Sequence, residues 1–252
     1  MGRQFLKQPR NAHERLVCET CHGPGQAHVE AGGGKGQGGL ISFARHDKTP
    51  VETRNRLCLD CHSKGERLFW KESSHEARDV ACTDCHRVME DASPRAQLVK
   101  ATEIDTCQIC HMQQAHARQW RSSHMPLREG KMSCTSCHNP HGTVHQTLLR
   151  EASLNDTCYR CHADKRGPFL WEHAPVGESC ANCHEPHGTN HEKMLKVAKP
   201  RLCQQCHIES RHPTSPYGVN AGSFKFVLGA SCLSCHVNIH GSNHPSGFAF
   251  TR

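Results

Sequence analysis

The chain has 252 residues, of which 35% are hydrophobic and only 5% aromatic, and its formal net charge is +7. So few apolar side chains exclude an ordinary globular domain built around a protein core. The sequence contains no run of about 18 or more apolar residues, so no transmembrane helix is predicted.

The cysteines determine the class of the chain. All 18 fall into C-x-x-C pairs, and a histidine directly follows every pair, which gives motifs 1 to 9 in chain order. Two thiols about one helical turn apart can add to the two vinyl groups of one haem, and the adjacent histidine then reaches the iron. The predicted thioether positions are Cys18, Cys21, Cys58, Cys61, Cys82, Cys85, Cys107, Cys110, Cys134, Cys137, Cys158, Cys161, Cys180, Cys183, Cys203, Cys206, Cys232 and Cys235. The predicted proximal ligands are His22, His62, His86, His111, His138, His162, His184, His207 and His236.

Zinc ribbons and disulfide scaffolds are the alternative explanation of paired cysteines, but neither requires a histidine after every pair. The prediction is therefore nine haem c groups. Each haem offers a large apolar plate to about 28 residues of chain, so we expect the haems to be the core and the haem-free chain not to fold. The haem propionates offset the positive charge, and no nucleic-acid partner is predicted.

The motifs begin at residues 18, 58, 82, 107, 134, 158, 180, 203 and 232, and alternate starts from residue 82 lie 52, 46 and 52 residues apart. These spacings indicate a repeating two-haem unit. The predicted segments are an N-terminal two-haem segment with a Gly-rich loop (1–64), three two-haem repeats (65–115, 116–165 and 166–210) and a C-terminal one-haem segment (211–252).

Secondary structure is expected mainly as short helical turns at the motifs, because Pro, Gly, Asn and Ser are frequent between them. Residues 32–39 are rich in glycine and predict a flexible loop. The predicted fold is mostly irregular with short α-helices, an elongated multihaem cytochrome c with its haems in a quasi-linear chain.

Fourteen further histidines are available as second axial ligands, which favours bis-His iron at most haems. Three of them precede a motif by seven to ten residues, and three others follow a motif by three or four. In the H-G-x-x-H pairs that begin at His141, His187 and His240 we prefer the first member, because the following glycine allows a close approach. The distal candidates are His13, His28, His75, His124, His141, His173, His187, His212 and His240.

Met89 stands after motif 3 at the offset where two other repeats have histidine. A thioether ligand would raise the potential of its haem. Methionine also fills irregular apolar gaps, and this alternative stays open.

Several longer stretches carry a resemblance to a known family. They are R-S-S-H ending at His124, C-H-N-P-H-G from Cys137, N-D-T-C-Y-R-C-H from Asn155, R-G-P-F-L-W-E-H-A-P-V from Arg166, L-C-Q-Q-C-H from Leu202 and C-H-V-N-I-H-G-S-N-H-P-S-G from Cys235. With them the chain resembles the decahaem cytochromes of the MtrA/DmsE family along essentially its whole length. The resemblance implies a haem wire inside an outer-membrane β-barrel porin, passing electrons between periplasmic donors and extracellular cytochromes or acceptors.

The chain departs from that family in having nine motifs instead of ten, and in having Met89. The resemblance places it in the periplasm or outer membrane of a Gram-negative bacterium, yet residues 1–20 lack a secretory signal. We therefore expect either that the numbering begins inside a longer precursor or that a signal was replaced. A soluble periplasmic shuttle or a filament subunit remains an alternative. A multihaem reductase is not favoured, since such enzymes often carry a variant C-x-x-C-K motif and all nine motifs here end in histidine.

Overall fold

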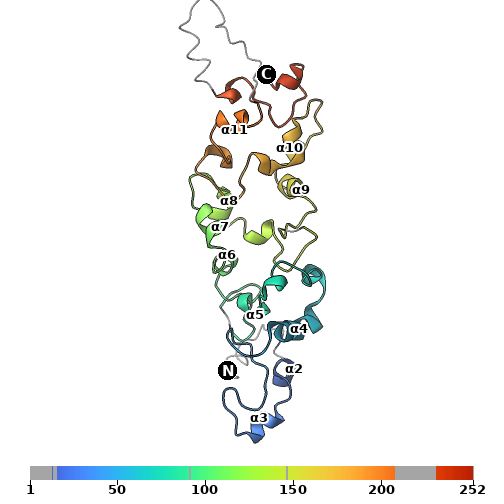
Figure 1. The fold of residues 1–252 in the computed structure, drawn as a ribbon, viewed down its shortest axis with the longest axis vertical. Helices are drawn as coiled ribbons and strands as arrows, with labels where there is room; N and C mark the ends of the chain where they lie inside the picture. Colours follow the sequence, from blue (N-terminus) through green and yellow to red (C-terminus); the bar gives the residue numbers. More distant parts are fainter. Residues whose placement is uncertain (1–12, 14–15, 91, 146, 208–230, 252) are drawn as a thin grey trace, which may run out of the picture. The chain divides into compact units, whose positions relative to one another are not determined.

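The computed structural model describes residues 13, 16–90, 92–145, 147–207 and 231–251 (Figure 1). The distal candidate His212 lies outside these residues. All α-helices in the described part are short, and the longest has 12 residues. They are α2 (Cys18–His22), α3 (Gln26–Glu30), α4 (Val51–His62), α5 (Cys82–Cys85), α6 (Glu103–Cys107), α7 (Met112–Ala117), α8 (Met125–Arg128), α9 (Leu154–Tyr159), α10 (Ala174–Glu178) and α11 (Arg201–Gln204).

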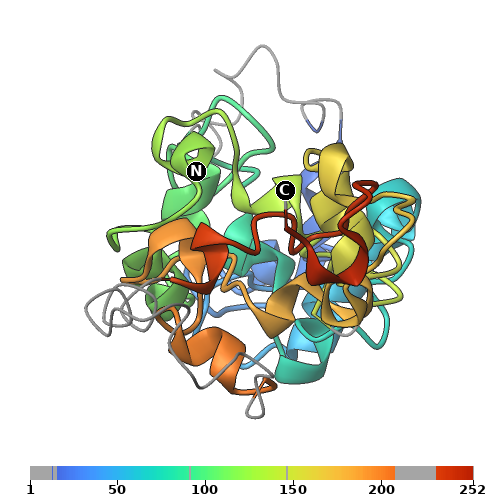
Figure 2. The ribbon, with the colours of Figure 1, turned by 90° about the horizontal axis from the view of Figure 1, so that it is seen from above.

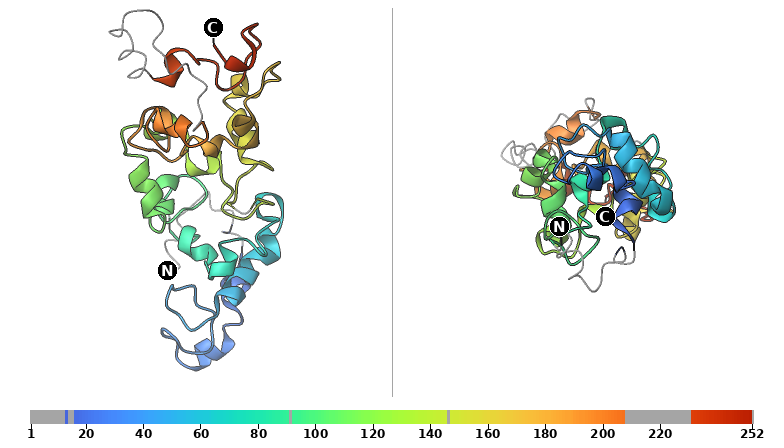
Figure 3. Two further views of the ribbon diagram at one scale, coloured as in Figure 1. Left: turned by 45° about the horizontal axis from the view of Figure 1, so that its top comes forward. Right: turned by 90° about the horizontal axis from the view of Figure 1, so that it is seen from below.

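Short 3₁₀ helices supply the remaining regular structure: η1 (Gly65–Arg67), η2 (Glu76–Arg78), η3 (Cys134–Ser136), η4 (Ala163–Lys165), η5 (Cys180–Asn182), η6 (Glu192–Met194), η8 (Cys232–Ser234) and η9 (Gly247–Ala249). The described residues form no β-strand, only isolated bridges. Irregular loops separate the helices in every view (Figure 3). The prediction of a mostly irregular fold with short α-helices is therefore confirmed.

The chain divides into two compact units. The first unit is Met1–Met112 with Ser133–Arg150, and the second is Gln113–Met132 with Glu151–Arg252. Each unit thus combines segments that are distant in the sequence. The five segments predicted from the motif spacing describe a repeat along the sequence and not compact units in space. They stay a prediction.

The first unit packs helices of neighbouring motifs against each other. Helix α4 contacts α5, and α6 contacts η3. Isolated antiparallel bridges join His86 to Leu98 and His138 to Leu149, so the chain returns to the motif histidine after an intervening loop.

The second unit follows the same plan. Helices α9 and α10, drawn in yellow in Figure 2, both contact η5. Bridges join His184 to Leu195 and Trp171 to Ser242. The bridge that follows the motif histidine in the first unit thus recurs in the second.

Buried apolar side chains are scarce in the described residues. Those with little exposure are Trp70, Ala81, Ala117, Leu149 and Leu195, and no large side chain there is fully buried. The protein atoms therefore do not form a core of their own. None of the described helices has both the length and the apolar character needed to cross a membrane.

Candidate haem-binding site

The attachment motifs adopt the helical turns that the sequence predicts. In motifs 3 to 9 the histidine N–H donates to the carbonyl oxygen of the first cysteine at 2.9–3.0 Å. In motifs 1 and 2 the same residues end the helices α2 and α4. This hydrogen bond closes one helical turn, so both thiols and the imidazole, at positions i, i+3 and i+4, lie on the same side of that turn.

In the first unit, cysteines of successive motifs lie next to each other. Burial and then Cys58 and Cys61 of motif 2 raise the pKa of Cys21 in motif 1. A hydrogen bond with Cys82 lowers the pKa of Cys58 to about 7 and raises the pKa of Cys82. In space, motif 1 therefore lies beside motif 2, and motif 2 lies beside motif 3.

The series continues through motifs 4 and 5. Burial, then Asp84 and then the nearby Cys110 raise the pKa of Cys85. A hydrogen bond with Cys134 raises the pKa of Cys107. A thioether carries no proton, so these pKa shifts do not apply to the haem-loaded protein. The contacts show only which cysteines lie close to one another.

The second unit has the same arrangement. Burial and then Cys206 raise the pKa of Cys183, and burial and then Cys232 raise that of Cys203. The pKa of Tyr159 is raised by burial and then by Cys180 and Cys158, so motif 6 lies near motif 7. Within each unit, each motif is therefore close to the next one along the chain.

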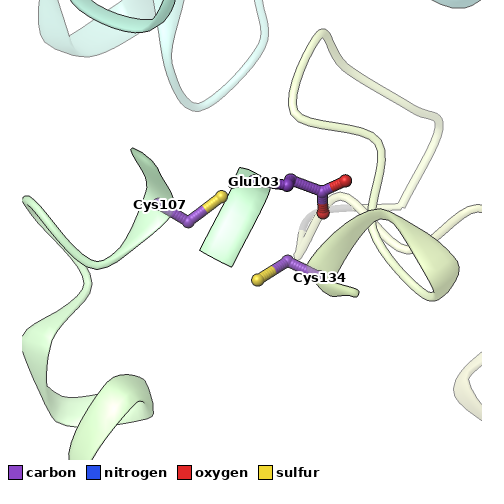
Figure 4. Close-up of side chains that lie close together, drawn as sticks. All are labelled: Glu103, Cys107 and Cys134. Atoms are coloured by element: carbon purple, nitrogen blue, oxygen red, sulfur yellow. The ribbon is translucent and has the colours of Figure 1, made fainter. Parts of the chain in front are cut away.

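Glu103, Cys107 and Cys134 form a close cluster (Figure 4), with one ligand atom of each within 4.8 Å of the others. Both sulfur atoms belong to attachment motifs. The Glu103 carboxylate accepts hydrogen bonds from the Thr135 backbone N–H at 2.7 Å and from the Ser133 hydroxyl at 3.0 Å. Glu103 therefore holds η3 beside α6, and the cluster is part of the attachment geometry.

Six of the predicted proximal histidines have the ring of a predicted distal histidine facing them. Two imidazoles bonded to one metal ion through nitrogen, with bonds of about 2 Å each, have ring centroids roughly 6 Å apart. The observed pairs and centroid distances are His13 with His62 (5.7 Å), His75 with His111 (6.1 Å), His141 with His86 (5.9 Å), His124 with His162 (6.5 Å), His173 with His207 (6.1 Å) and His240 with His184 (6.3 Å).

Hydrogen bonds orient many of these rings. In five proximal and three distal candidates, Nδ1 lies 2.5–3.0 Å from a backbone carbonyl oxygen. Because a carbonyl oxygen can only accept, Nδ1 carries the proton and donates it to this hydrogen bond. A proton on Nδ1 leaves the lone pair of a neutral imidazole on Nε2, which is the form that binds iron. The pairs are His22 with Ile41, His86 with Ala96, His138 with Thr147, His184 with Lys193, His236 with Ala249, His75 with Pro140, His124 with Pro186 and His173 with Ile239.

In two of the three H-G-x-x-H pairs the second histidine behaves differently. Nδ1 of His145 accepts the backbone N–H of Thr147 at 3.2 Å, and Nδ1 of His244 accepts that of Ser246 at 3.1 Å. An Nδ1 acceptor places the proton of a neutral ring on Nε2. These two rings are therefore in the tautomer that does not present Nε2 to iron.

Burial favours the neutral ring at several distal candidates. Burial and then the neighbouring His86 lower the pKa of His141 to about 4. Burial lowers the pKa of His240 and of His13 as well. A neutral ring has the free lone pair that ligation requires.

Two further distal candidates make polar contacts close to their own positions in the sequence. His28 lies on α3, and its Nδ1 is 2.9 Å from the Gln37 carbonyl oxygen. His187 Nδ1 lies 3.2 Å from the Glu185 carboxylate. The ring described beside His22 is that of Phe43, at 5.4 Å.

The residues present fit covalently bound haem. Paired thiols on helical turns, facing imidazoles at the distance that one iron would span, and the lack of a protein core in the described residues all match an apolar plate with axial nitrogen ligands. The sequence reasoning missed the polar bridges that set motif spacing. Asn55 and Asn155 stand three residues before motifs 2 and 6, and each accepts the N–H of the first cysteine of the next motif.

Comparisons with known proteins agree with this chemistry. The family "Doubled CXXCH motif" matches residues 124–167 and 173–212, and the family "Cytochrome c-type protein NrfB-like" matches residues 18–110. Among curated proteins, the multiheme cytochrome MtrA of Shewanella baltica (strain OS185) is 47% identical over 238 residues, which cover 92% of this chain and 69% of the relative.

Proposed function

Since the chain belongs to the family of MtrA multihaem cytochromes and transfers electrons through c-type haems, we propose that it is an electron conduit across the outer membrane. In this proposal it carries nine haems, one at each motif. It lies inside a β-barrel porin and links periplasmic donors to extracellular acceptors.

The observation that carries the proposal is the order of the cysteine contacts. Thioether sulfurs sit at the edge of the porphyrin, so neighbouring sulfurs bring neighbouring porphyrin edges together. Cys58 lies against Cys82, and Cys107 lies within 4.8 Å of Cys134. Within each unit, haems attached in this order would form a row in which each electron transfer is to the haem of the next motif.

The side chains have separate roles in this proposal. The cysteines attach the haems, the proximal histidines bind the irons, and the facing histidines complete bis-His coordination at motifs 2, 3, 4, 6, 7 and 8. The bound haem supplies the reversible one-electron chemistry of iron. Bis-His iron has no open position, so these six haems are expected to carry electrons and not to bind a substrate.

Localisation and transfer together test the conduit. The haem-loaded protein should co-purify with a barrel protein from outer membranes. Liposomes that contain this complex should then pass electrons from an internal reductant to an external acceptor that cannot cross lipid. The matched control is the same complex with the double substitution Cys107→Ala and Cys110→Ala, which removes one internal haem and should stop transfer.

Two results would reject the conduit. One is isolation of the native protein as a soluble monomer without any membrane partner, which would favour a periplasmic shuttle. The other is unchanged transfer in the liposomes after the Cys107→Ala and Cys110→Ala substitutions. Rapid stoichiometric binding of carbon monoxide to a haem of motif 2, 3, 4, 6, 7 or 8 would instead indicate an open iron and favour a reductase.

A further inference from the structure

A four-residue turn follows motif 5 in the first unit and motif 9 in the second. The turns are residues 139–142 and 238–241, and in each the N–H of the last residue donates to the carbonyl oxygen of the first, at 3.1 and 2.9 Å. The third residue of each turn is a predicted distal ligand, His141 or His240. Both rings face the proximal histidine two motifs earlier, which is that of motif 3 for His141 and that of motif 7 for His240.

The residue before that histidine orients a second distal ligand. In the first unit the Pro140 carbonyl oxygen accepts a hydrogen bond from Nδ1 of His75 at 2.7 Å, and the His75 ring faces the proximal histidine of motif 4. In the second unit the Ile239 carbonyl oxygen accepts from Nδ1 of His173 at 3.0 Å, and the His173 ring faces the proximal histidine of motif 8. A backbone carbonyl bonded to Nδ1 fixes the tautomer and the orientation of a metal-binding imidazole. One peptide group therefore joins the distal ligands of two successive motifs, because its carbonyl orients one ligand and its nitrogen belongs to the other.

The turn of the first unit is held closely against residues 66–75, which lead to the second of these ligands. Asn139 Nδ2 donates to the Glu66 carbonyl oxygen at 2.7 Å. Gly142 has φ +110°, and a side-chain carbon there would collide with the Phe69 carbonyl oxygen. Asn139 and Gly142 are the first and last residues of the turn, so both of its ends are fixed on the same segment.

The turn of the second unit docks onto residues 168–173 in a corresponding way. Trp171 and Ser242 exchange two backbone hydrogen bonds, at 2.9 and 3.0 Å. A side-chain carbon at Gly241 would collide with the ring of Phe169. Different contacts thus produce the same docking in both units, and in both the docked segment ends at a distal ligand.

We propose that the docking of each turn completes the coordination of two irons at once, those of motifs 3 and 4 in the first unit and those of motifs 7 and 8 in the second. Asn139 and Gly142 are positioning residues in this arrangement. Through one turn they hold His141 for one iron and the Pro140 carbonyl, which orients His75, for the other. The inference rests on the bis-His coordination of the proposed function and not on the outer-membrane conduit.

The test counts the haems that open, which means that they become high-spin and bind carbon monoxide, in the full haem-loaded protein. His141→Ala and His75→Ala should each open one haem and give the reference spectra for motifs 3 and 4. Gly142→Ala displaces the turn, so it should open the motif 3 haem and also weaken the bond of His75 to the motif 4 iron by about 10- to 100-fold. Carbon monoxide competes with the distal histidine, so its affinity for the motif 4 haem should rise by the same factor. Gly130→Ala, at a glycine with φ +70° and nothing within 4 Å, is the control for a side chain at positive φ and should open no haem.

Two further variants separate docking from loss of folding. Asn139→Ala removes the hydrogen bond to Glu66 without adding a collision, and it should affect the same two haems more weakly. Gly241→Ala should affect the haems of motifs 7 and 8 and leave those of motifs 3 and 4 unchanged.

Three results would overturn the shared docking. The first is that Gly142→Ala and Asn139→Ala change only the motif 3 haem, as His141→Ala does. The second is that they open haems outside the pair. The third is that His141→Ala and His75→Ala open no haem, in which case the bis-His coordination is itself wrong. Because every readout is made on the isolated protein, failure of transfer across a membrane would reject the conduit alone.

Discussion

Asn155 Oδ1 accepts a hydrogen bond from the backbone N–H of Cys180 at 2.7 Å, while its Nδ2 donates to the Val176 carbonyl oxygen at 2.9 Å. Asn155 is buried and precedes motif 6 by three residues, whereas Cys180 begins motif 7. Asn55 bridges motif 2 to Cys82 of motif 3 in the same way, at 2.9 Å. One amide side chain therefore fixes the distance between two attachment sites in each unit.

Substitution of Asn155 by alanine should destabilise the haem-loaded protein by about 2 kcal/mol, because it removes the partner of a part-buried N–H and of a part-buried carbonyl. The midpoint of guanidinium unfolding, followed by haem absorption, measures the loss. Asn190→Ala at an exposed asparagine of the same unit is the matched control and should shift the midpoint little. Equal shifts in the two variants would show that the Asn155 bridge is not important.

The pair His141 and His145 tests which histidine of H-G-x-x-H binds iron. His141 faces His86, whereas Nδ1 of His145 accepts the N–H of Thr147. We expect His141→Ala to convert the motif 3 haem to high-spin iron that binds carbon monoxide, and His145→Ala to leave every haem low-spin. Electron paramagnetic resonance of the oxidised variants distinguishes the two, and a high-spin signal from His145→Ala alone would reverse the assignment.

Much of the fold and of the site follows from local sequence. A C-x-x-C-H motif predicts its own helical turn, because a single hydrogen bond within five residues closes it. The composition predicts an irregular fold with short helices, which is confirmed. The Asn bridges were also within reach, since Asn55 and Asn155 stand at the same offset before their motifs.

The pairing of the rings did not follow from the sequence. His141 lies 55 residues from the His86 ring that it faces, with motifs 4 and 5 between them. Hydrophobic periodicity does not predict such contacts in this chain, because the described residues bury few apolar side chains. The spacing of motifs predicts a repeat but not that a loop serves the motif two positions earlier.

Gly188 tests the close approach of one turn to a distant segment. Its φ is +129°, and a side-chain carbon there would collide with the carbonyl oxygen of Ala117. Gly188→Ala should therefore cost about 3 kcal/mol through backbone strain and overpacking. Gly177→Ala is the control, because a carbon added at this position in α10 meets nothing within 4 Å. It should be neutral or stabilise by up to ~1 kcal/mol. The two unfolding midpoints should move in opposite directions or differ clearly, and equal shifts would contradict the collision.

Removal of the haems should abolish the fold. The described chain buries Trp70, Leu149, Leu195 and two alanines as its apolar core, and this surface cannot offset the entropy of ordering so many residues. Protein produced in a host without the haem-attachment machinery should show no cooperative thermal transition by circular dichroism. Haem-loaded protein from a competent host is the control and should unfold cooperatively. Because each motif of a unit lies close to the next motif of that unit, loss of the haem from a single motif should loosen its neighbours most. Hydrogen exchange of the double variant Cys107→Ala/Cys110→Ala should therefore rise first around motifs 3 and 5. A cooperative transition in the haem-free chain would show that polar bridges such as those of Asn55 and Asn155 hold the units together without the cofactor.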